Sequence, residues 1–331
     1  MSNTLFVLLD GAEDDPIPEF DGKKPLDVAR MPFLHSKARH KMYTTGRGYT
    51  HLFLNEFFSG RPPEMSRGAL EAYGFGLRMG PGRVAYRLTP ARIAGVDLRW
   101  AYDSEGFADE LESRVRENLH MLEDPDVRFY MGGKAVLTFK GDCPEPDGFP
   151  VPPKDGPYRR FPGELGELVD KVAREMGGVT DYPWGGGSPG RGGRSFPCLG
   201  RMTAISNGPV ALGIAASLGH DIMLVDDIEA RFPAARDALE TGNVFLHLDE
   251  VDEYSHQKDP GKKVRVLELI DRLMCEHFSD VEDIVYFVDH GTSCVTGEHI
   301  LMTVPFWTSI DSGFRDGETV PLKDIVPGLL P

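Results

Sequence analysis

Residues 4–11 read TLFVLLDG, a continuous apolar run that ends at Asp10 and Gly11. Two similar runs occur late in the chain, NVFLHL at 243–248 and DIVYFVD at 283–289. Short continuous apolar runs are typical of strands that are buried on both faces of a parallel sheet. Each run leads into acidic residues or histidines, and ligands of open α/β sheets collect beyond the carboxyl ends of the strands. The sequence therefore predicts an α/β fold with a polar site at one edge of a mostly parallel sheet.

Helical patterns separate these predicted strands. Residues 262–275, KKVRVLELIDRLMC, place apolar side chains at helical spacing, and residues 209–217 open with a proline, which suits the first position of a helix. Lys262 and Lys263 stand at the start of the first of these helices, where solvated side chains are expected. Helices flanking the sheet complete the predicted core.

The middle of the chain differs in composition. Residues 143–163 are rich in proline, and residues 185–194, GGGSPGRGGR, are rich in glycine. Both compositions are typical of loops and not of buried strands. The interpretation is a core formed by residues 1–80 and 201–331, interrupted at 81–200 by a smaller inserted α+β domain that acts as a lid.

Composition excludes several classes of partner. A net charge of −16 over 331 residues, with no basic stripe, argues against a nucleic-acid polymer. An anionic substrate would need local positive charge from metals or arginines. No stretch approaches the roughly 18 apolar residues of a membrane helix, so no membrane partner is expected. The four cysteines form no CxxC pair, which favours reduced thiols in a cytoplasmic protein.

Aspartates and histidines gather after the predicted strands. They are Asp10, Asp252, His256, Asp289, His290 and His299. Carboxylate and imidazole together suit borderline divalent ions such as Mn²⁺ or Zn²⁺, and two such clusters suit a pair of ions about 3.5–4 Å apart. Each piece alone is weak, since an Asp-Gly step is usually a turn. Their joint occurrence after apolar runs favours a site for two divalent metal ions.

A hydroxyl nucleophile is predicted in residues 49–63, YTHLFLNEFFSGRPP. Thr50 precedes an apolar helical segment, and a helix N-terminus offers free amide donors and a favourable dipole to an anion. Coordination by a metal would lower the pKa of the hydroxyl and activate it. The alternative is that Thr50 only caps the helix.

Several longer motifs carry a family resemblance. They are LLDGAEDDP with GKKPLDVARMPFLHSKA in 8–38, SRGALEAYGFGLRMGPGRVAYRL at 66–88, DYPWGGGSP at 181–189, AISNGPVALGIAASLGHD at 204–221, DEYSHQKDPGKKVRVLELID at 252–271 and DHGTSCVTGEH at 289–299. Through them the chain resembles the alkaline phosphatase superfamily, and within it the archaeal-type cofactor-independent (2,3-bisphosphoglycerate-independent) phosphoglycerate mutases. The likeness runs along almost the whole chain. It implies an alkaline-phosphatase-like core and a substrate-gripping lid at 81–200.

The resemblance also implies ligand sets. One metal would be held by Asp252, His256 and His299, and the other by Asp10, Asp289, His290 and the nucleophile. The family's serine motif, PGSDxAxL, is absent. Thr50 falls at the position of that serine and is preferred to Thr4, Thr44 and Thr45, with His51 where the family has an aspartate.

The substrate-binding residues depart from the family as well. The family's YRH appears here at 133–135 with Lys134 in the middle, which replaces an arginine fork by a point charge. The candidate substrate residues are Arg67, Lys134, Arg191 and Arg194. Five other histidines have no partner pattern and are expected at the surface or in packing positions: His35, His40, His120, His220 and His247.

The leading functional hypothesis is a phosphoglycerate-mutase-like phosphotransferase that acts on a small phosphorylated or phosphonate carboxylate through a covalent phospho-threonine. The alternative is a metal-dependent phosphatase or phosphodiesterase that hydrolyses a phosphoester or a nucleotide-linked phosphonate. Exclusion of water by the lid would decide between the two. A catalytically silent metal-binding homologue is the third hypothesis, and a homo-oligomer is compatible with the sequence.

Overall fold

The computed structural model describes residues 2–101, 104, 106–142, 155–188, 190 and 193–330. The chain forms two compact units, a core unit of Met1–Pro63 with Gly193–Pro331 and an inserted unit of Glu64–Gly192. The insertion thus starts before residue 81, because helix α4 (Arg67–Gly74) packs on the inserted sheet. A Cβ atom at Gly68 would come within 2.9 Å of the backbone of Tyr86, Arg87 and Gly185, so this packing requires glycine.

A seven-stranded sheet forms the centre of the core unit, and its order is β10-β9-β11-β1-β12-β15-β2. Strand β1 (Leu5–Leu9) lies between β11 (Asn243–Leu248) and β12 (Ile284–Phe287), parallel to both. The other strands are β2 (His40–Thr45), β9 (Met202–Ser206), β10 (Asp221–Leu224) and β15 (Thr303–Thr308). Only β15 runs against its neighbours in this sheet, so the predicted mostly parallel α/β sheet is confirmed.

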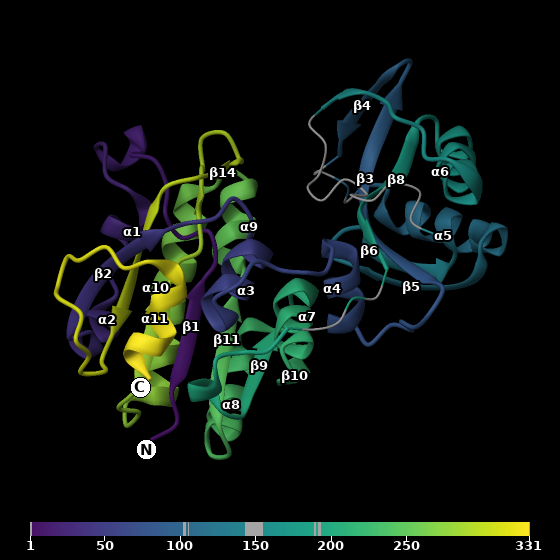
Figure 1. Cartoon of the computed structure of the whole chain (residues 1–331). Coiled ribbons are helices and arrows are strands. Elements are labelled where there is room, and N and C mark those ends of the chain that lie inside the picture. Colours follow the sequence, from purple (N-terminus) through teal and green to yellow (C-terminus); the bar gives the residue numbers. More distant parts are fainter. Residues whose placement is uncertain are drawn as a thin grey trace. The chain divides into compact units, whose positions relative to one another are not determined.

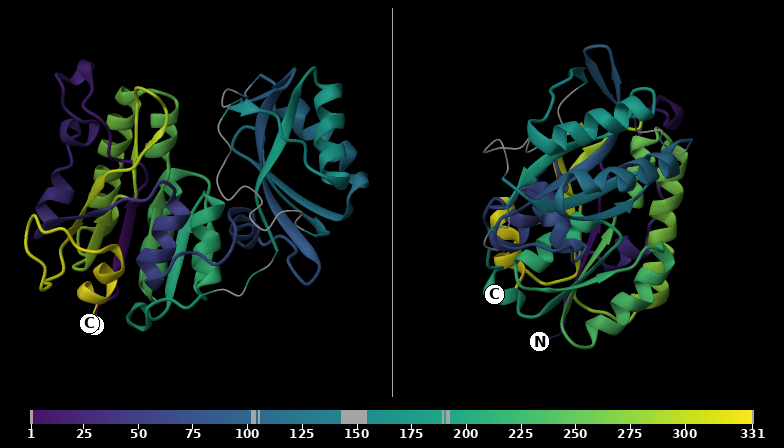
Figure 2. Two further views of the ribbon diagram at one scale, coloured as in Figure 1. Left: turned by 45° about the horizontal axis from the view of Figure 1, so that its top comes forward. Right: turned by 90° about the vertical axis from the view of Figure 1, so that its right-hand side faces the viewer.

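Helices cover both faces of this sheet (Figures 1 and 2). One face carries α3 (Thr50–Ser59), α7 (Pro209–Ser217) and α11 (Leu322–Leu329). The other face carries α8 (Ile228–Leu239) and α10 (Pro260–Phe278), with α9 (Glu250–His256) leading from β11 into α10. Shorter elements are α1 (Pro25–Val28), α2 (Pro32–Lys37) and the 3-10 helices Pro18–Phe20, Leu119–Met121 and Pro197–Leu199. None of the described helices is long and apolar enough to cross a membrane.

Aromatic packing fixes α3 against the central strands. All five residues of β1 are fully buried, as the apolar run predicts. Phe57 of α3 stacks on Phe287 of β12 with ring centroids 4.4 Å apart, and Phe58 meets Phe245 of β11 edge to face. Burial of each such side chain contributes about 2–3 kcal/mol. The N-terminus of α3, with Thr50, is thereby held near the strand ends.

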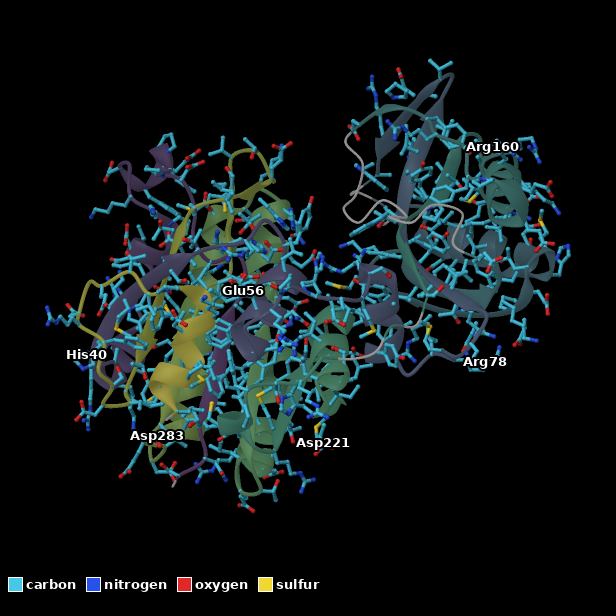
Figure 3. The ribbon with its side chains drawn as sticks, in the orientation of Figure 1. His40, Glu56, Arg78, Arg160, Asp221 and Asp283 are labelled. Carbon is cyan, nitrogen blue, oxygen red and sulfur yellow. The ribbon has the colours of Figure 1, made fainter. Side chains whose placement is uncertain are left out.

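The inserted unit is built around an antiparallel sheet of order β5-β6-β3-β4-β7, in which β8 also pairs with β3. Its strands are β3 (Arg83–Ala94), β4 (Asp97–Trp100), β5 (Glu123–Tyr130), β6 (Lys134–Lys140), β7 (Gly156–Pro157) and β8 (Val179–Gly187). Helices α5 (Ala108–Asn118) and α6 (Gly163–Glu175) pack on this sheet. Charged side chains such as Arg78 and Arg160, labelled in Figure 3, are exposed and pair with aspartates.

Candidate metal centre

Three neighbouring strands bring the predicted acidic residues together. Asp10 directly follows β1, Asp289 comes two residues after the end of β12, and Asp252 lies on α9, which begins two residues after β11. Because β1 pairs in parallel with both β11 and β12, the carboxyl ends of the three strands meet at one edge. The order of strands therefore explains why residues more than 200 positions apart share one site.

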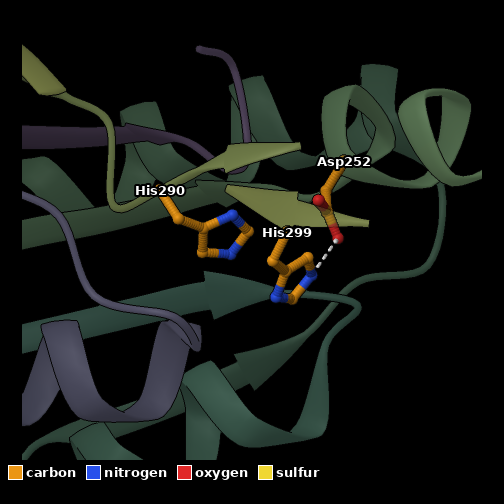
Figure 4. Close-up of side chains that lie close together, drawn as sticks. All are labelled: Asp252, His290 and His299. Carbon is orange, nitrogen blue, oxygen red and sulfur yellow. Dashed lines mark ion pairs between the residues drawn. The ribbon is translucent and has the colours of Figure 1, made fainter. Parts of the chain in front are cut away.

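Three different elements position the three histidines at the site. His290 follows Asp289 in the chain, and His256 lies one helical turn after Asp252 on α9. His299 starts β14 (His299–Ile300), which pairs antiparallel with β13 (Gly291–Thr292) and returns the chain to the site. The resulting cluster of Asp252, His290 and His299 is shown in Figure 4.

One set of ligand atoms is formed by Asp252, His256 and His299. The Asp252 Oδ2 atom lies 3.1 Å from His256 Nε2 and 3.8 Å from His299 Nε2, and the two Nε2 atoms are 3.2 Å apart. Ligand atoms that bind one tetrahedral cation at about 2.1 Å lie about 3.4 Å from one another. These three side chains are therefore spaced as ligands of a single cation would be.

A second set is formed around His290. Its Nε2 atom lies 3.3 Å from Asp10 Oδ1 and 3.3 Å from Asp289 Oδ2. The Thr50 Oγ1 atom lies 3.4 Å from His290 Nε2 and 3.4–3.5 Å from the two carboxylate oxygens of Asp10. The Asp289 Oδ2 atom is buried and has no hydrogen-bond partner among the described residues. An unpaired buried carboxylate oxygen is costly, and a cation at this point would remove that cost.

The three histidines present the same nitrogen to the cluster. Their Nδ1 atoms contact oxygen acceptors: His256 the Gly297 carbonyl at 2.7 Å, His299 the Gly48 carbonyl at 2.8 Å, and His290 the Thr292 hydroxyl at 3.2 Å. Since Thr292 Oγ1 donates its own proton to Asp252, it can accept from His290. Each neutral ring then carries its proton on Nδ1 and turns the lone pair of Nε2 into the site. Such fixed tautomers suit metal ligation.

The electrostatics of the site favour positive charge. Burial, followed by the charges of Asp289 and Asp252, raises the pKa of Asp10 well above its ordinary value. Burial alone would lower the pKa of His256, but the charge of Asp252 and their hydrogen bond outweigh it and raise the pKa of His256 to about 9. Both shifts show a concentration of carboxylates that a divalent cation would neutralise.

Thr50 is the first residue of α3, and the N-cap position belongs to Tyr49, which makes no side-chain capping bond. The Thr50 hydroxyl instead faces Asp10 and His290 and is 7% exposed. The other hydroxyls that the sequence offered lie elsewhere: Thr44 and Thr45 on β2, and Thr4 just before β1. Among the threonines considered as nucleophiles from the sequence, Thr50 is the one whose hydroxyl lies beside Asp10 and His290.

The candidate substrate residues are distributed over separate elements. Arg67 donates to Glu71 at 2.5 Å, and this fully buried carboxylate also accepts from Arg87 and Tyr130. Lys134 opens β6 in the inserted unit, while Arg194 is exposed in the core unit. Arg191 lies outside the described residues.

Two expectations about single residues are wrong. His247, expected at the surface or in packing, is 2% exposed and lies with its Nε2 atom 2.7 Å from Asp10 Oδ2. Lys263, expected to be solvated, is fully buried and pairs with Asp14. Their carboxylate partners, Asp10 and Asp14, lie more than 200 residues away in the chain, so no local sequence pattern indicates these contacts. The described cysteines, Cys198, Cys275 and Cys294, are free thiols.

Comparisons with known proteins find similarity to metalloenzymes and to phosphoglycerate mutases. Residues 218–325 match the model of the metalloenzyme superfamily. A 2,3-bisphosphoglycerate-independent phosphoglycerate mutase of Thermococcus kodakarensis is 26% identical over 91% of this chain and 86% of its own length. The mutase of Picrophilus torridus is 25% identical over 93% of this chain and 89% of its own length.

Solved structures share the fold. A Pyrococcus horikoshii protein superposes with a TM-score of 0.70 at 18% identity, and 99% of this chain and 97% of that protein are covered. The cofactor-independent phosphoglycerate mutase of Thermoplasma acidophilum superposes with a TM-score of 0.51 at 16% identity, with 98% of both chains covered. At these identities the superpositions establish the architecture alone.

The family match and the relatives agree on the class of protein: residues 218–325 match the metalloenzyme superfamily, and a metal-dependent phosphomutase is supported, as the sequence motifs indicate. The chain is similar, along nearly its whole length, to 2,3-bisphosphoglycerate-independent phosphoglycerate mutases. This homology supports the general prediction of a metal-dependent phosphotransfer enzyme.

Proposed function

We propose that this protein transfers a phosphoryl group within a small phosphorylated carboxylate, as a mutase, with two divalent cations and a covalent phospho-threonine at Thr50. The observation that carries the proposal is the position of the Thr50 hydroxyl, 3.4 Å from His290 Nε2 and next to Asp10. The matched mutases supply the substrate class, since they are similar over more than nine-tenths of this chain.

The residues present fit two cations. The first would be held by Asp252, His256 and His299, and the second by Asp10, Asp289 and His290, with Thr50 beside it. The mixed carboxylate and imidazole donors suit Mn²⁺ or Zn²⁺. Bound cations would supply positive charge that lowers the pKa of the Thr50 hydroxyl and neutralises the phosphoryl oxygens.

The protein's own groups account for the transfer. Thr50 Oγ1 attacks phosphorus, an oxygen–phosphorus bond forms on the threonine, and the bond from phosphorus to the substrate oxygen breaks. The hydroxyl proton has the carboxylate of Asp10 and the Nε2 atom of His290 as its nearest basic neighbours, at 3.4–3.5 Å. The released substrate oxygen takes up a proton, and a second hydroxyl of the same molecule then attacks the phospho-threonine. The bond from phosphorus to Thr50 Oγ1 breaks, and the proton lost by the attacking hydroxyl restores the threonine hydroxyl. The net reaction moves the group and consumes no water.

The inserted unit is proposed to supply substrate contacts as a lid, with Lys134 and Arg67 as its candidate cationic residues. Lys134 is a point charge where the resembled family has an arginine. Hydrolysis of a phosphoester or of a nucleotide-linked phosphonate is therefore the second candidate function, since a weaker grip on the acceptor would let water reach the phospho-threonine.

Turnover assays separate these functions. The full-length protein is incubated with Mn²⁺ and 3-phosphoglycerate, and both 2-phosphoglycerate and inorganic phosphate are measured. Formation of the 2-isomer supports the mutase, and release of phosphate alone supports the hydrolase. If the metal-loaded protein forms neither product, both candidate functions are overturned for this substrate class.

The nucleophile is tested in the same assay. Thr50→Ala is expected to lower kcat by at least about a thousandfold, because removal of a catalytic nucleophile abolishes the covalent route. Thr50→Ser keeps a hydroxyl and should retain measurable turnover. Both variants must still bind Mn²⁺ with near wild-type stoichiometry, and unchanged kcat in Thr50→Ala would show that another group attacks phosphorus.

A further inference from the structure

His247 occupies a position that the chemistry above does not use. It lies near the end of β11 and is 2% exposed. Its Nε2 atom is 2.7 Å from Asp10 Oδ2, and its Nδ1 atom is 2.7 Å from the hydroxyl of Ser206, the last residue of β9. Because β11 lies between β9 and β1, this one imidazole connects the ends of three adjacent strands.

The hydrogen bonds around Ser206 determine which nitrogen of His247 carries the proton. The Gly208 amide donates to Ser206 Oγ at 2.8 Å, so the hydroxyl proton must go elsewhere. Its acceptors are His247 Nδ1 at 2.7 Å and the Gly208 carbonyl at 3.3 Å, and the shorter contact is the better one. Nδ1 therefore accepts, and the Nε2–H group of the neutral ring donates to Asp10.

This arrangement is the reverse of that in His256, His290 and His299, which have acceptors at Nδ1 and turn Nε2 toward the cluster of carboxylates. Those three rings offer lone pairs to the cluster, whereas His247 offers a proton to a carboxylate. His247 is thus suited to orient a ligand and not to be one. Outer partners of this kind fix the orientation of ligands in metal sites.

As a result, the two carboxylate oxygens of Asp10 have different neighbours. Oδ2 accepts the proton of His247 at 2.7 Å, while Oδ1 lies 3.3 Å from His290 Nε2. The carboxylate plane is therefore fixed with Oδ1 toward the cluster that also holds Asp289. Asp10 without this bond would be free to rotate about its terminal torsion, which has a broad and roughly two-fold profile.

We propose that His247, oriented by Ser206, is a positioning residue that holds Asp10 with Oδ1 directed at the cation beside Thr50. The inference rests on the two-cation centre proposed above. It assigns to this chain a Ser206–His247–Asp10 connection whose loss affects one cation and spares the other, because His256 and His299 have separate anchors at Gly297 and Gly48.

The test is Mn²⁺ binding to the purified, metal-depleted full chain, measured by calorimetry and by electron paramagnetic resonance. Wild type should bind two ions. His247→Leu should weaken one of them by about 10- to 100-fold, the usual effect of removing an outer partner, and leave the second unchanged. Ser206→Ala should weaken the same ion by a smaller factor. His35→Leu, a change of an exposed histidine on α2, should alter neither.

A conservative variant separates orientation from mere packing. In His247→Gln the side-chain amide can donate to Asp10 while its carbonyl accepts from Ser206, so both ions should bind within a few-fold of wild type. This variant also keeps the inference testable if His247→Leu does not fold. If His247→Gln weakens the binding of one ion as much as His247→Leu does, the inference is overturned.

Two further outcomes distinguish this inference from the proposed function. Two ions bound by His247→Leu with wild-type affinity would overturn the inference and leave the two-cation centre intact. If wild type binds neither Mn²⁺ nor Zn²⁺, the proposed two-cation centre is itself overturned.

Discussion

Asp181 is buried in β8 of the inserted unit at 1% exposure, and neither carboxylate oxygen has a hydrogen-bond partner among the described residues. Burial raises the pKa of Asp181 well above its ordinary value, and the charge of Arg87 offsets only part of this effect. The folded protein therefore keeps a proton that the unfolded chain releases near pH 4. Because the folded state binds more protons in this range, the free energy of unfolding falls as pH rises from about 4 toward the raised pKa.

Asp181→Asn should remove this dependence. We expect the variant to be more stable than wild type at pH 8, because the neutral amide has no proton to bind or release, and the difference to shrink toward pH 4. Urea unfolding at pH 5 and pH 8, followed by tryptophan fluorescence, measures the effect. Asp97→Asn, a change of an exposed aspartate at the start of β4, is the matched control and should change stability little. A gain for Asp181→Asn that is equal at both pH values would contradict the stated cause.

At the scale of elements, a lysine at the start of α10 contacts both the segment after β1 and the segment after β12. Lys263 Nζ is fully buried and donates to the Glu13 carbonyl at 3.1 Å, to Asp14 Oδ2 at 3.0 Å and to the Thr292 carbonyl at 3.0 Å. Glu13 and Asp14 belong to the loop after β1, and Thr292 to the ribbon after β12. This single cation therefore holds together the segments that carry Asp10 and His290.

Lys263→Met should destabilise the core unit by about 3–5 kcal/mol, because it leaves the charge of Asp14 buried without its partner. Adding Asp14→Asn in the same chain should recover part of that loss. The neighbour Lys262 is exposed, forms a 3.7 Å ion pair with Asp259 and lies 5.5 Å from the centroid of the Tyr254 ring. Because such exposed contacts contribute little, Lys262→Met should change stability by less than about 0.5 kcal/mol. Chemical denaturation of the three variants checks this. Similar losses for the two single lysine variants would argue against the buried pair.

At the scale of the whole molecule, every proposed cation ligand belongs to the core unit, because Glu64–Gly192 contributes none of them. Ligands that bind only the folded state stabilise it by mass action, by about 2.7 kcal/mol at a concentration of 100 times Kd. Removal of Mn²⁺ or Zn²⁺ with a chelator should therefore lower the Tm of the core unit and leave the inserted unit nearly unchanged.

Differential scanning calorimetry with and without Mn²⁺ tests this expectation. Readdition of the metal should restore the core transition. A core transition that does not respond to metal, or two transitions that shift equally, would speak against a centre confined to the core unit.

Local patterns in the sequence determined the strands β1, β11 and β12, the helices α7 and α10, and the residue types beside the strand ends. They did so because alternation, apolar runs and helical spacing are properties of neighbouring residues. The motifs also indicated the superfamily whose model residues 218–325 match.

Only the tertiary structure decided which partners meet. The link between His247 and Asp10, the burial of Lys263 against Asp14, and the start of the inserted unit at Glu64 all depend on contacts between distant segments. Such contacts are set by the order and register of strands in the folded sheet. The neighbours of a polar residue in an apolar run do not indicate which distant group will form its hydrogen bond.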